Sequence, residues 1–166
     1  MSLPALSLRQ ATDADTGLIV SSWLHSNRFS RYARILHPAT YTRDQRAAMT
    51  AILQRCAPVV VRTPDDRIAG WLVGEPKRPG QPYPILHYVW TRPEFRRCGL
   101  ARMTFEAWRA QHAASEPSFS ASHATDTARA ILGQSTWAAQ YFQCTNSHHM
   151  RFCLTLAREP TAFVAA

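Results

Sequence analysis

Lysine is almost missing from this chain of 166 residues, because Lys77 is the only lysine among nineteen basic residues. Arginine, which supplies the rest, binds phosphate and carboxylate groups through a planar pair of N–H donors, so its excess favours anionic ligands. A bias of composition that replaces lysine everywhere explains the same count equally well. The net charge of +8 is therefore compatible with anionic partners and does not by itself require them.

Long apolar runs are also absent, since none approaches the length of a membrane span. The first eight residues have neither the charged start nor the apolar centre of a signal peptide. We therefore expect a cytoplasmic protein with no membrane partner. The hydrophobic content of 46% and the length suit a globular protein with one domain, residues 1–166.

The cysteines form no C-x-x-C pair, and their spacing suits reduced thiols in a cytosolic protein better than a disulfide framework. They are Cys56, Cys98, Cys144 and Cys153. We expect them to be reduced and mostly buried. His148 and His149 could join the last two cysteines around a metal, but the spacing fits no standard zinc pattern. We therefore expect no metal.

The apolar patterns predict strands mixed with helices. Strands are expected at 5–11, 59–61, 68–74, 85–91, 118–122, 142–144 and 151–156, and helices at 12–26, 43–55, 100–112 and 127–132. Within the second helix, Ala48, Met49, Ile52 and Leu53 are expected to face inward. Hairpins mixed with helices indicate an α/β fold of the mixed α+β kind and exclude an alternating doubly wound sheet.

The most informative stretch is an arginine-rich turn, residues 93–102, between an expected strand and an expected helix. The free N–H groups of a first helical turn and the positive end of its dipole favour an anion. Arg96 and Arg97 place positive charge against that dipole, which is costly unless an anion binds there. Gly99 lets the backbone approach a ligand, and the small Ala101 avoids crowding. The alternative is a turn whose arginines face water.

The turn resembles the acetyl-CoA signature of the GCN5-related N-acetyltransferase (GNAT) superfamily. That signature is Gln or Arg, two residues, Gly, one residue, then Gly or Ala, and residues 96–101 match it, with the usual proline at Pro93. The element order is similar as well. The resemblance implies a mixed, mostly antiparallel sheet flanked by helices. It also implies transfer of an acetyl or similar group from acetyl-CoA, or another acyl-CoA, to an amine.

The resemblance further implies how the coenzyme is held. The turn would hold the pyrophosphate through its backbone amides, and the preceding strand would pair with the pantetheine arm where it splays from its neighbour. The turn residues are Arg96, Arg97, Cys98, Gly99, Leu100, Ala101 and Arg102. The strand residues are Val89, Trp90 and Thr91. The amine would attack the thioester directly, assisted by a base and an acid.

His87 is the candidate base, because a neutral imidazole suits proton transfer near pH 7. A hydrogen-bonded core histidine is the alternative, as is a water relay or a remote base. In the family the acid is often a tyrosine in the helix after the fifth strand. Tyr141 is the nearest candidate here, and packing in the core beside Trp137 and Phe142 is its alternative.

Arginines and aromatic residues alternate over residues 28–34, and such a segment could bind nucleic acid through phosphates and stacked bases. Its candidate acceptor-binding residues are Arg28, Arg31, Tyr32 and Arg34. The stretch from Ser21 to Arg34 resembles small phage-encoded GNAT proteins, some relatives of which modify DNA bases. A solvated surface is the alternative for this segment. For the whole protein, the alternative is a catalytically weak domain that binds coenzyme A or nucleic acid.

Overall fold

The computed structural model describes residues 5–28, 37–81, 83–112, 114, 118–122, 137–143 and 152–158. Two compact units make up the chain. The first combines Met1–Gly74 with Tyr88–Trp108, and the second combines Glu75–His87 with Arg109–Ala166. That residues 1–166 act as one domain stays a prediction.

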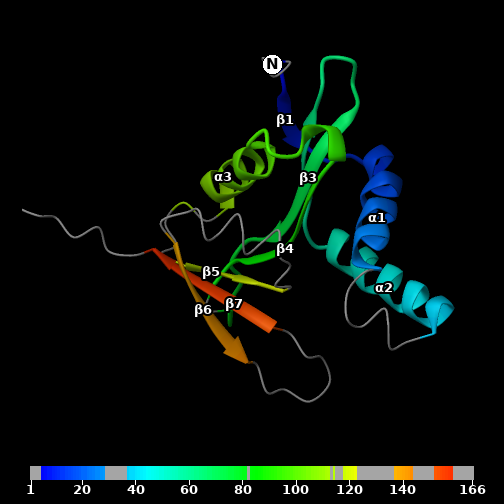
Figure 1. Ribbon diagram of the computed structural model, residues 1–166. Coiled ribbons are helices and arrows are strands. Elements are labelled where there is room, and N and C mark those ends of the chain that lie inside the picture. The colour runs from blue at the N-terminus through cyan, green and yellow to red at the C-terminus, as the bar shows by residue number, and fades with distance from the viewer. Residues whose placement is uncertain are drawn as a thin grey trace, which may run out of the picture. The chain divides into compact units, whose positions relative to one another are not determined.

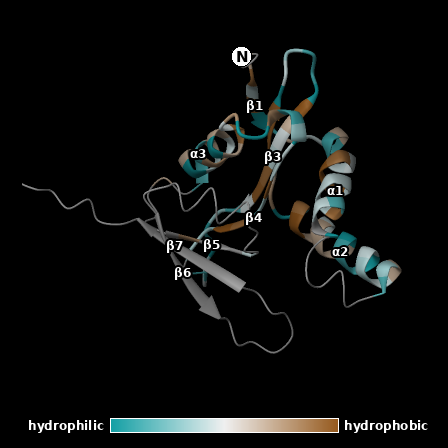
Figure 2. Ribbon diagram, in the orientation of Figure 1, coloured by the Kyte–Doolittle hydropathy of each residue, from teal (hydrophilic) through white to brown (hydrophobic). Residues whose placement is uncertain are grey.

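The first unit contains an antiparallel hairpin with an edge strand beside it. The strand order is β1 (Ser7–Gln10), β2 (Val59–Arg62), β3 (Ile68–Glu75) and β4 (Ile85–Thr91). Val60 lies opposite Trp71 in the hairpin, and Arg9 lies opposite Val60 at the edge. β3 is buried along its whole length and is strongly hydrophobic (Figure 2). The predicted hairpin is therefore confirmed.

Two helices connect β1 to β2. α1 (Asp13–Asn27) begins at Thr12, whose backbone N–H donates to Asp15 Oδ2 at 2.8 Å. α2 (Pro38–Leu53) begins five residues earlier than the predicted residue 43. The prediction was wrong because Pro38 suits the first helical position, where its missing N–H costs nothing.

The main core lies between the sheet and these helices, which cover one side of the strands, while α3 (Leu100–His112) covers the other (Figure 1). The fully buried residues of the main core include Ile19, Trp23, Met49, Val60 and Trp71. Met49 confirms the predicted inner face of α2, where Ile52 and Leu53 are half-buried. Ala48 is exposed, so its predicted inward position was wrong.

The start of α3 lies very close to β3. A Cβ atom at Gly70 would lie 2.6 Å from Leu100 Cδ2 and 2.9 Å from the carbonyl oxygen of Trp90. Only a glycine fits under that helix, and Leu100 is buried there with 2% exposure. The contact sets the position at which the helix begins.

In the second unit the strand order is β4, β5 (Ser118–Ala121), β7 (Phe152–Arg158) and β6 (Trp137–Gln143). β4 and β5 are parallel, with Leu86 opposite Ala121, whereas β5–β7 and β6–β7 are antiparallel. The two predicted closing strands are confirmed, although both are longer than expected. The predicted helix at 127–132 lies outside the described residues. A mixed, mostly antiparallel sheet with flanking helices is the fold class expected from the sequence.

Candidate functional site

The arginine-rich turn is a short 3-10 helix, Pro93–Phe95, followed by four turn residues and the start of α3. Arg92 attaches the beginning of this turn to β3. The backbone N–H of Arg92 donates to Ala69 O at 2.8 Å, and its Nε donates to Ile68 O at 3.0 Å. The predicted arrangement of strand, turn and helix is therefore confirmed.

Two residues of this turn have left-handed backbones, Arg97 with φ 65° and Gly99 with φ 77°. Glycine adopts this conformation without cost, whereas an arginine there is strained. Apart from its two chain neighbours, no described residue has an atom within 4 Å of the position that a Cβ on Gly99 would take. The backbone at Gly99 is therefore open to a ligand.

The first α-helical bond of α3 runs from Met103 N to Gly99 O at 2.9 Å. The amides of Leu100, Ala101 and Arg102 come before it, so they have no acceptor within the helix. The first turn of α3 contains no acidic residue, and Arg102 is exposed. N–H donors without an acceptor in the helix, the positive end of a helix dipole and arginine cations thus lie together, which favours a phosphate-sized anion.

The other turn residues lie at the surface. Arg96, Arg97 and Cys98 are exposed, and Arg96 Nε approaches Thr91 O at 3.4 Å. Cys98 is exposed in the turn, whereas Cys56 is buried, so the expected burial of the thiols holds for Cys56 and not for Cys98. Val89, Trp90 and Thr91 are half-buried at the end of β4, directly before the turn.

His87 is buried in the second unit, with 7% exposure, and both nitrogens of its ring have partners. Nε2 lies 3.0 Å from Glu75 Oε1, and Nδ1 lies 3.0 Å from Ser122 Oγ. Glu75 is the last residue of β3, with 3% exposure, and its Oε2 lies 3.3 Å from Arg78 Nη2. The structure thus joins a carboxylate, an imidazole and a hydroxyl in one chain of contacts.

The sequence reasoning missed Glu75 and Ser122. Glu75 was visible as an acidic residue that directly follows the apolar run 68–74, which is a weak signal for a buried carboxylate with a partner. Ser122 follows β5, and its N–H donates to Leu86 O at 2.9 Å. Nothing in the sequence indicates this register, so the contact with His87 could not be predicted.

Tyr141 lies in strand β6, opposite Leu154, and not in a helix after the fifth strand. Its role as an acid stays a prediction. Arg28 is exposed at the end of α1, and its backbone N–H donates to Leu24 O at 3.1 Å. Arg31, Tyr32 and Arg34 lie outside the described residues, as do Cys144, His148 and His149. The predicted separation of β4 from the neighbouring strand cannot be followed either, because the chain after residue 122 also lies outside the described residues.

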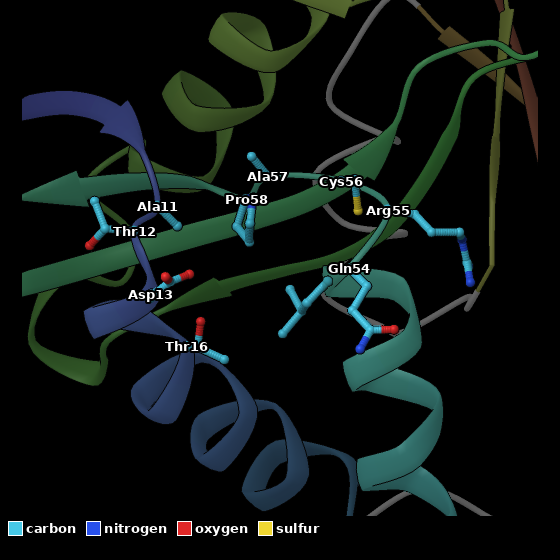
Figure 3. Close-up of a pocket in the computed structure, with 10 residues that line it drawn as sticks. Ala11, Thr12, Asp13, Thr16, Gln54, Arg55, Cys56, Ala57 and Pro58 are labelled. Atoms are coloured by element: carbon cyan, nitrogen blue, oxygen red, sulfur yellow. The ribbon is translucent and has the colours of Figure 1, made fainter.

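Three further features bear on function. Across the described ranges, no group of three or more His, Cys, Asp and Glu side chains could hold a metal. Helices able to span a bilayer are likewise missing from the described part of the chain. A surface pocket lies between the start of α1 and the segment after α2, where Thr12, Asp13, Thr16, Gln54 and Cys56 contribute to its wall (Figure 3). None of the predicted site residues lines that pocket.

Comparisons with known proteins agree with this geometry. Solved structures of low identity share the fold. Apo YjaB from Escherichia coli has a TM-score of 0.64 at 16% identity, and the match covers 93% of this chain and 98% of the YjaB chain. YncA from Salmonella typhimurium, solved with its cofactor acetyl-CoA, has a TM-score of 0.59 at 15% identity. The match covers 92% of this chain and 91% of the YncA chain.

Diaminobutyrate acetyltransferase EctA from Paenibacillus lautus was solved with L-2,4-diaminobutyric acid and coenzyme A. It has a TM-score of 0.60 at 9% identity, and the match covers 93% of this chain and 96% of the EctA chain. No curated protein matches the sequence. The family model of the acetyltransferase (GNAT) family matches residues 22–131, which include β2 to β5, the arginine-rich turn and α3. The chain therefore belongs to the GNAT acetyltransferase family.

Proposed function

We propose that this protein transfers an acetyl or similar acyl group from acyl-CoA to an amine, by direct attack of the amine on the thioester. The observation that carries the proposal is the open turn before α3, with its left-handed Gly99 and unused helix amides. The acetyl-CoA and coenzyme A found in YncA and EctA support it. Residues 1–166 act as one acyltransferase domain in this proposal.

The residues of the turn fit an acyl-CoA pyrophosphate. The amides of residues 97–102 donate to its oxygens, while Arg96, Arg97 and Arg102 balance its charge. Val89, Trp90 and Thr91 offer the backbone of β4 to the pantetheine arm. When bound, the acyl-CoA supplies a thioester carbonyl that an amine can attack.

The acceptor must present a neutral amine, because a protonated amine has no electron pair for attack. His87 accepts the proton that the amine loses, and Tyr141 is the candidate acid for the leaving thiolate. A turnover–pH profile that is the same in His87→Gln as in the unaltered protein would remove His87 from this role. Mass spectrometry of proteins and DNA from cells with and without expression, searching for an added acyl mass, identifies the acceptor class.

The proposal is tested by thermal unfolding with acetyl-CoA. Acetyl-CoA at 100 times its dissociation constant stabilises by about 2.7 kcal/mol, which raises the midpoint of a domain this size by roughly 5 to 10 °C. Gly99→Trp abolishes the shift, because its side chain fills the open space over the turn.

Gly80→Trp is the matched control, since Gly80 has φ 79°, lies in equally open space and belongs to a different loop. It keeps the full shift. If the unaltered protein shows no shift at millimolar acetyl-CoA, the coenzyme is not a ligand and the proposed function fails.

A further inference from the structure

Neither ring nitrogen of His87 is available to meet an amine directly. Its Nε2 lies 3.0 Å from Glu75 Oε1 and its Nδ1 lies 3.0 Å from Ser122 Oγ. His87 and Glu75 are also buried, with 7% and 3% exposure. If this histidine moves a proton, the proton has to pass through one of its partners.

The charges around Glu75 define which nitrogen is the base. Arg78 Nη2 lies 3.3 Å from Glu75 Oε2, and this cation favours the ionised carboxylate. An ionised carboxylate only accepts hydrogen bonds, so Nε2 of His87 carries the proton and donates it to Oε1. The basic electron pair therefore lies on Nδ1, where Ser122 Oγ donates to it.

Ser122 is held in this position by the sheet. Its backbone N–H donates to Leu86 O at 2.9 Å, which continues the parallel pairing of β4 and β5. Its side-chain hydroxyl also lies 3.4 Å from the carbonyl oxygen of His87, a second acceptor for the hydroxyl proton. Ser122 is half-buried, so it is more open to solvent than Glu75 or His87.

We propose that Ser122 is the residue that contacts the acceptor amine and relays its proton to His87, while Glu75 is a positioning residue that holds His87 in the required tautomer. This inference rests on the proposed acyl transfer. It adds two residues that the family's turn motif does not contain. The order of contacts runs from Arg78 through Glu75 and His87 to Ser122.

Ser122 Oγ takes a proton from the amine as the amine nitrogen bonds to the thioester carbon, and Ser122 passes its own proton to His87 Nδ1. The C–S bond then breaks, with its electron pair on sulfur. Tyr141, the candidate acid, gives its proton to the thiolate. His87 is left as an imidazolium beside the Glu75 carboxylate, and its extra proton returns through solvent to the Tyr141 phenolate.

The same three groups could instead make Ser122 a nucleophile, as in hydrolases that combine a serine, a histidine and a carboxylate. That chemistry leaves the acyl group on Ser122 Oγ. Incubation of the protein with acetyl-CoA and no acceptor, followed by peptide mass spectrometry, distinguishes the two. We expect an unmodified Ser122 peptide, and an acetylated one would overturn the relay.

The tautomer has a direct measurement that does not depend on activity. Nitrogen-15 NMR of the imidazole side chains distinguishes a protonated Nε2 from a protonated Nδ1, and His87→Gln assigns the signals. We expect Nε2–H in the unaltered protein and a mixture of tautomers in Glu75→Gln, where the amide can donate as well as accept. An Nδ1–H form in the unaltered protein would contradict the relay.

Kinetics test the role of Ser122. Ser122→Ala should lower kcat about 100-fold or more, the usual contribution of a positioned proton-transfer group. Ser122→Thr keeps the hydroxyl and should restore most of the rate. Ser21→Ala removes an exposed hydroxyl of α1 that bonds only within its own helix, and it should leave kcat unchanged. Unfolding midpoints show whether each variant is folded.

The outcomes separate the relay from the proposed function. If the unaltered protein transfers acyl groups and Ser122→Ala does so at the same rate, the relay is wrong and the proposed function stands. If the unaltered protein neither binds acetyl-CoA nor transfers an acyl group, the proposed function fails. In that case the NMR measurement still decides whether Glu75 and Ser122 hold His87 as described.

Discussion

Trp108 packs so tightly over Gly74 that a Cβ atom on residue 74 would lie 2.4 Å from Cε2 of the indole. Gly70 lies under Leu100 in the same way. The four residue steps of strand from Gly70 to Gly74 span about 13 Å, and the eight residue steps of helix from Leu100 to Trp108 span about 12 Å. Because the two spans are nearly equal, Leu100 and Trp108 of α3 fit over Gly70 and Gly74 of β3. These two contacts position the start of α3, whose amides belong to the turn.

Alanine at either glycine should destabilise the fold. Gly74→Ala forces apart β3 and the buried indole of Trp108, and overpacking of this kind costs about 1–3 kcal/mol. Gly70→Ala meets both Leu100 and a backbone oxygen, so a similar cost is expected. Urea unfolding measures both changes.

Gly17→Ala is the matched control. Gly17 lies inside α1 with nothing within 4 Å of a Cβ, so alanine there should stabilise by about 0.5–1 kcal/mol. Unfolding free energies that fall equally in all three variants would show that close approach of α3 is not the cause.

Arg97→Gly should raise the stability of the unliganded protein. The left-handed backbone of Arg97 costs about 1–2 kcal/mol, and glycine removes that cost while adding some entropy to the unfolded chain, so the expected net gain is below about 1 kcal/mol. Arg96, with φ −69°, has no such strain, and Arg96→Gly should lose stability. Chemical unfolding of the two variants without ligand checks the opposite signs.

The ion pair between Arg9 and Asp15 makes the stability of the fold depend on pH in the acidic range. Hydrogen bonds from the Arg9 guanidinium, helped by Thr12, lower the pKa of Asp15 to about 2, although burial opposes them. The carboxylate therefore stabilises the fold fully above its unfolded pKa of 3.8, by about 2 kcal/mol. This contribution is lost as the pH falls from about 4 through 2.

Asp15→Asn should remove this pH dependence and lower the stability at pH 7. Asp44→Asn changes an exposed carboxyl beside Arg43 and should keep the dependence. Unfolding free energies measured from pH 2 to 7 test both variants, and an unchanged acid profile in Asp15→Asn would contradict the assignment.

Cys98 should be a reporter of coenzyme binding. It is exposed within the turn, whereas Cys56 is buried and its Sγ donates to Ile52 O at 3.1 Å. Iodoacetamide should alkylate Cys98 quickly, and acetyl-CoA should slow that reaction. Peptide mass spectrometry follows each site, with Cys56 reacting slowly whether or not acetyl-CoA is present. Equal alkylation of Cys98 with and without acetyl-CoA would place the coenzyme elsewhere.

Sequence patterns predicted those elements that depend on neighbouring residues. The β-branched strand from Val59, the apolar strand from Ile68 and the helix from Leu100 each carry a local signal, and each begins where expected. The start of α2 and the exposure of Ala48 were predicted wrongly. Proline often ends a helix, but Pro38 occupies a first helical position, and small apolar residues such as Ala48 fit inside or outside a core.

The sequence by itself determined the turn at residues 96–102, because backbone amides and arginines of one continuous segment make an anion site wherever that segment lies. Only the tertiary structure brought Glu75, His87 and Ser122 together. Glu75 ends β3, His87 lies within β4 and Ser122 follows β5, and their meeting depends on the register that places Leu86 opposite Ala121. A register shifted by one residue would turn each side chain to the other face, and no local pattern specifies that choice.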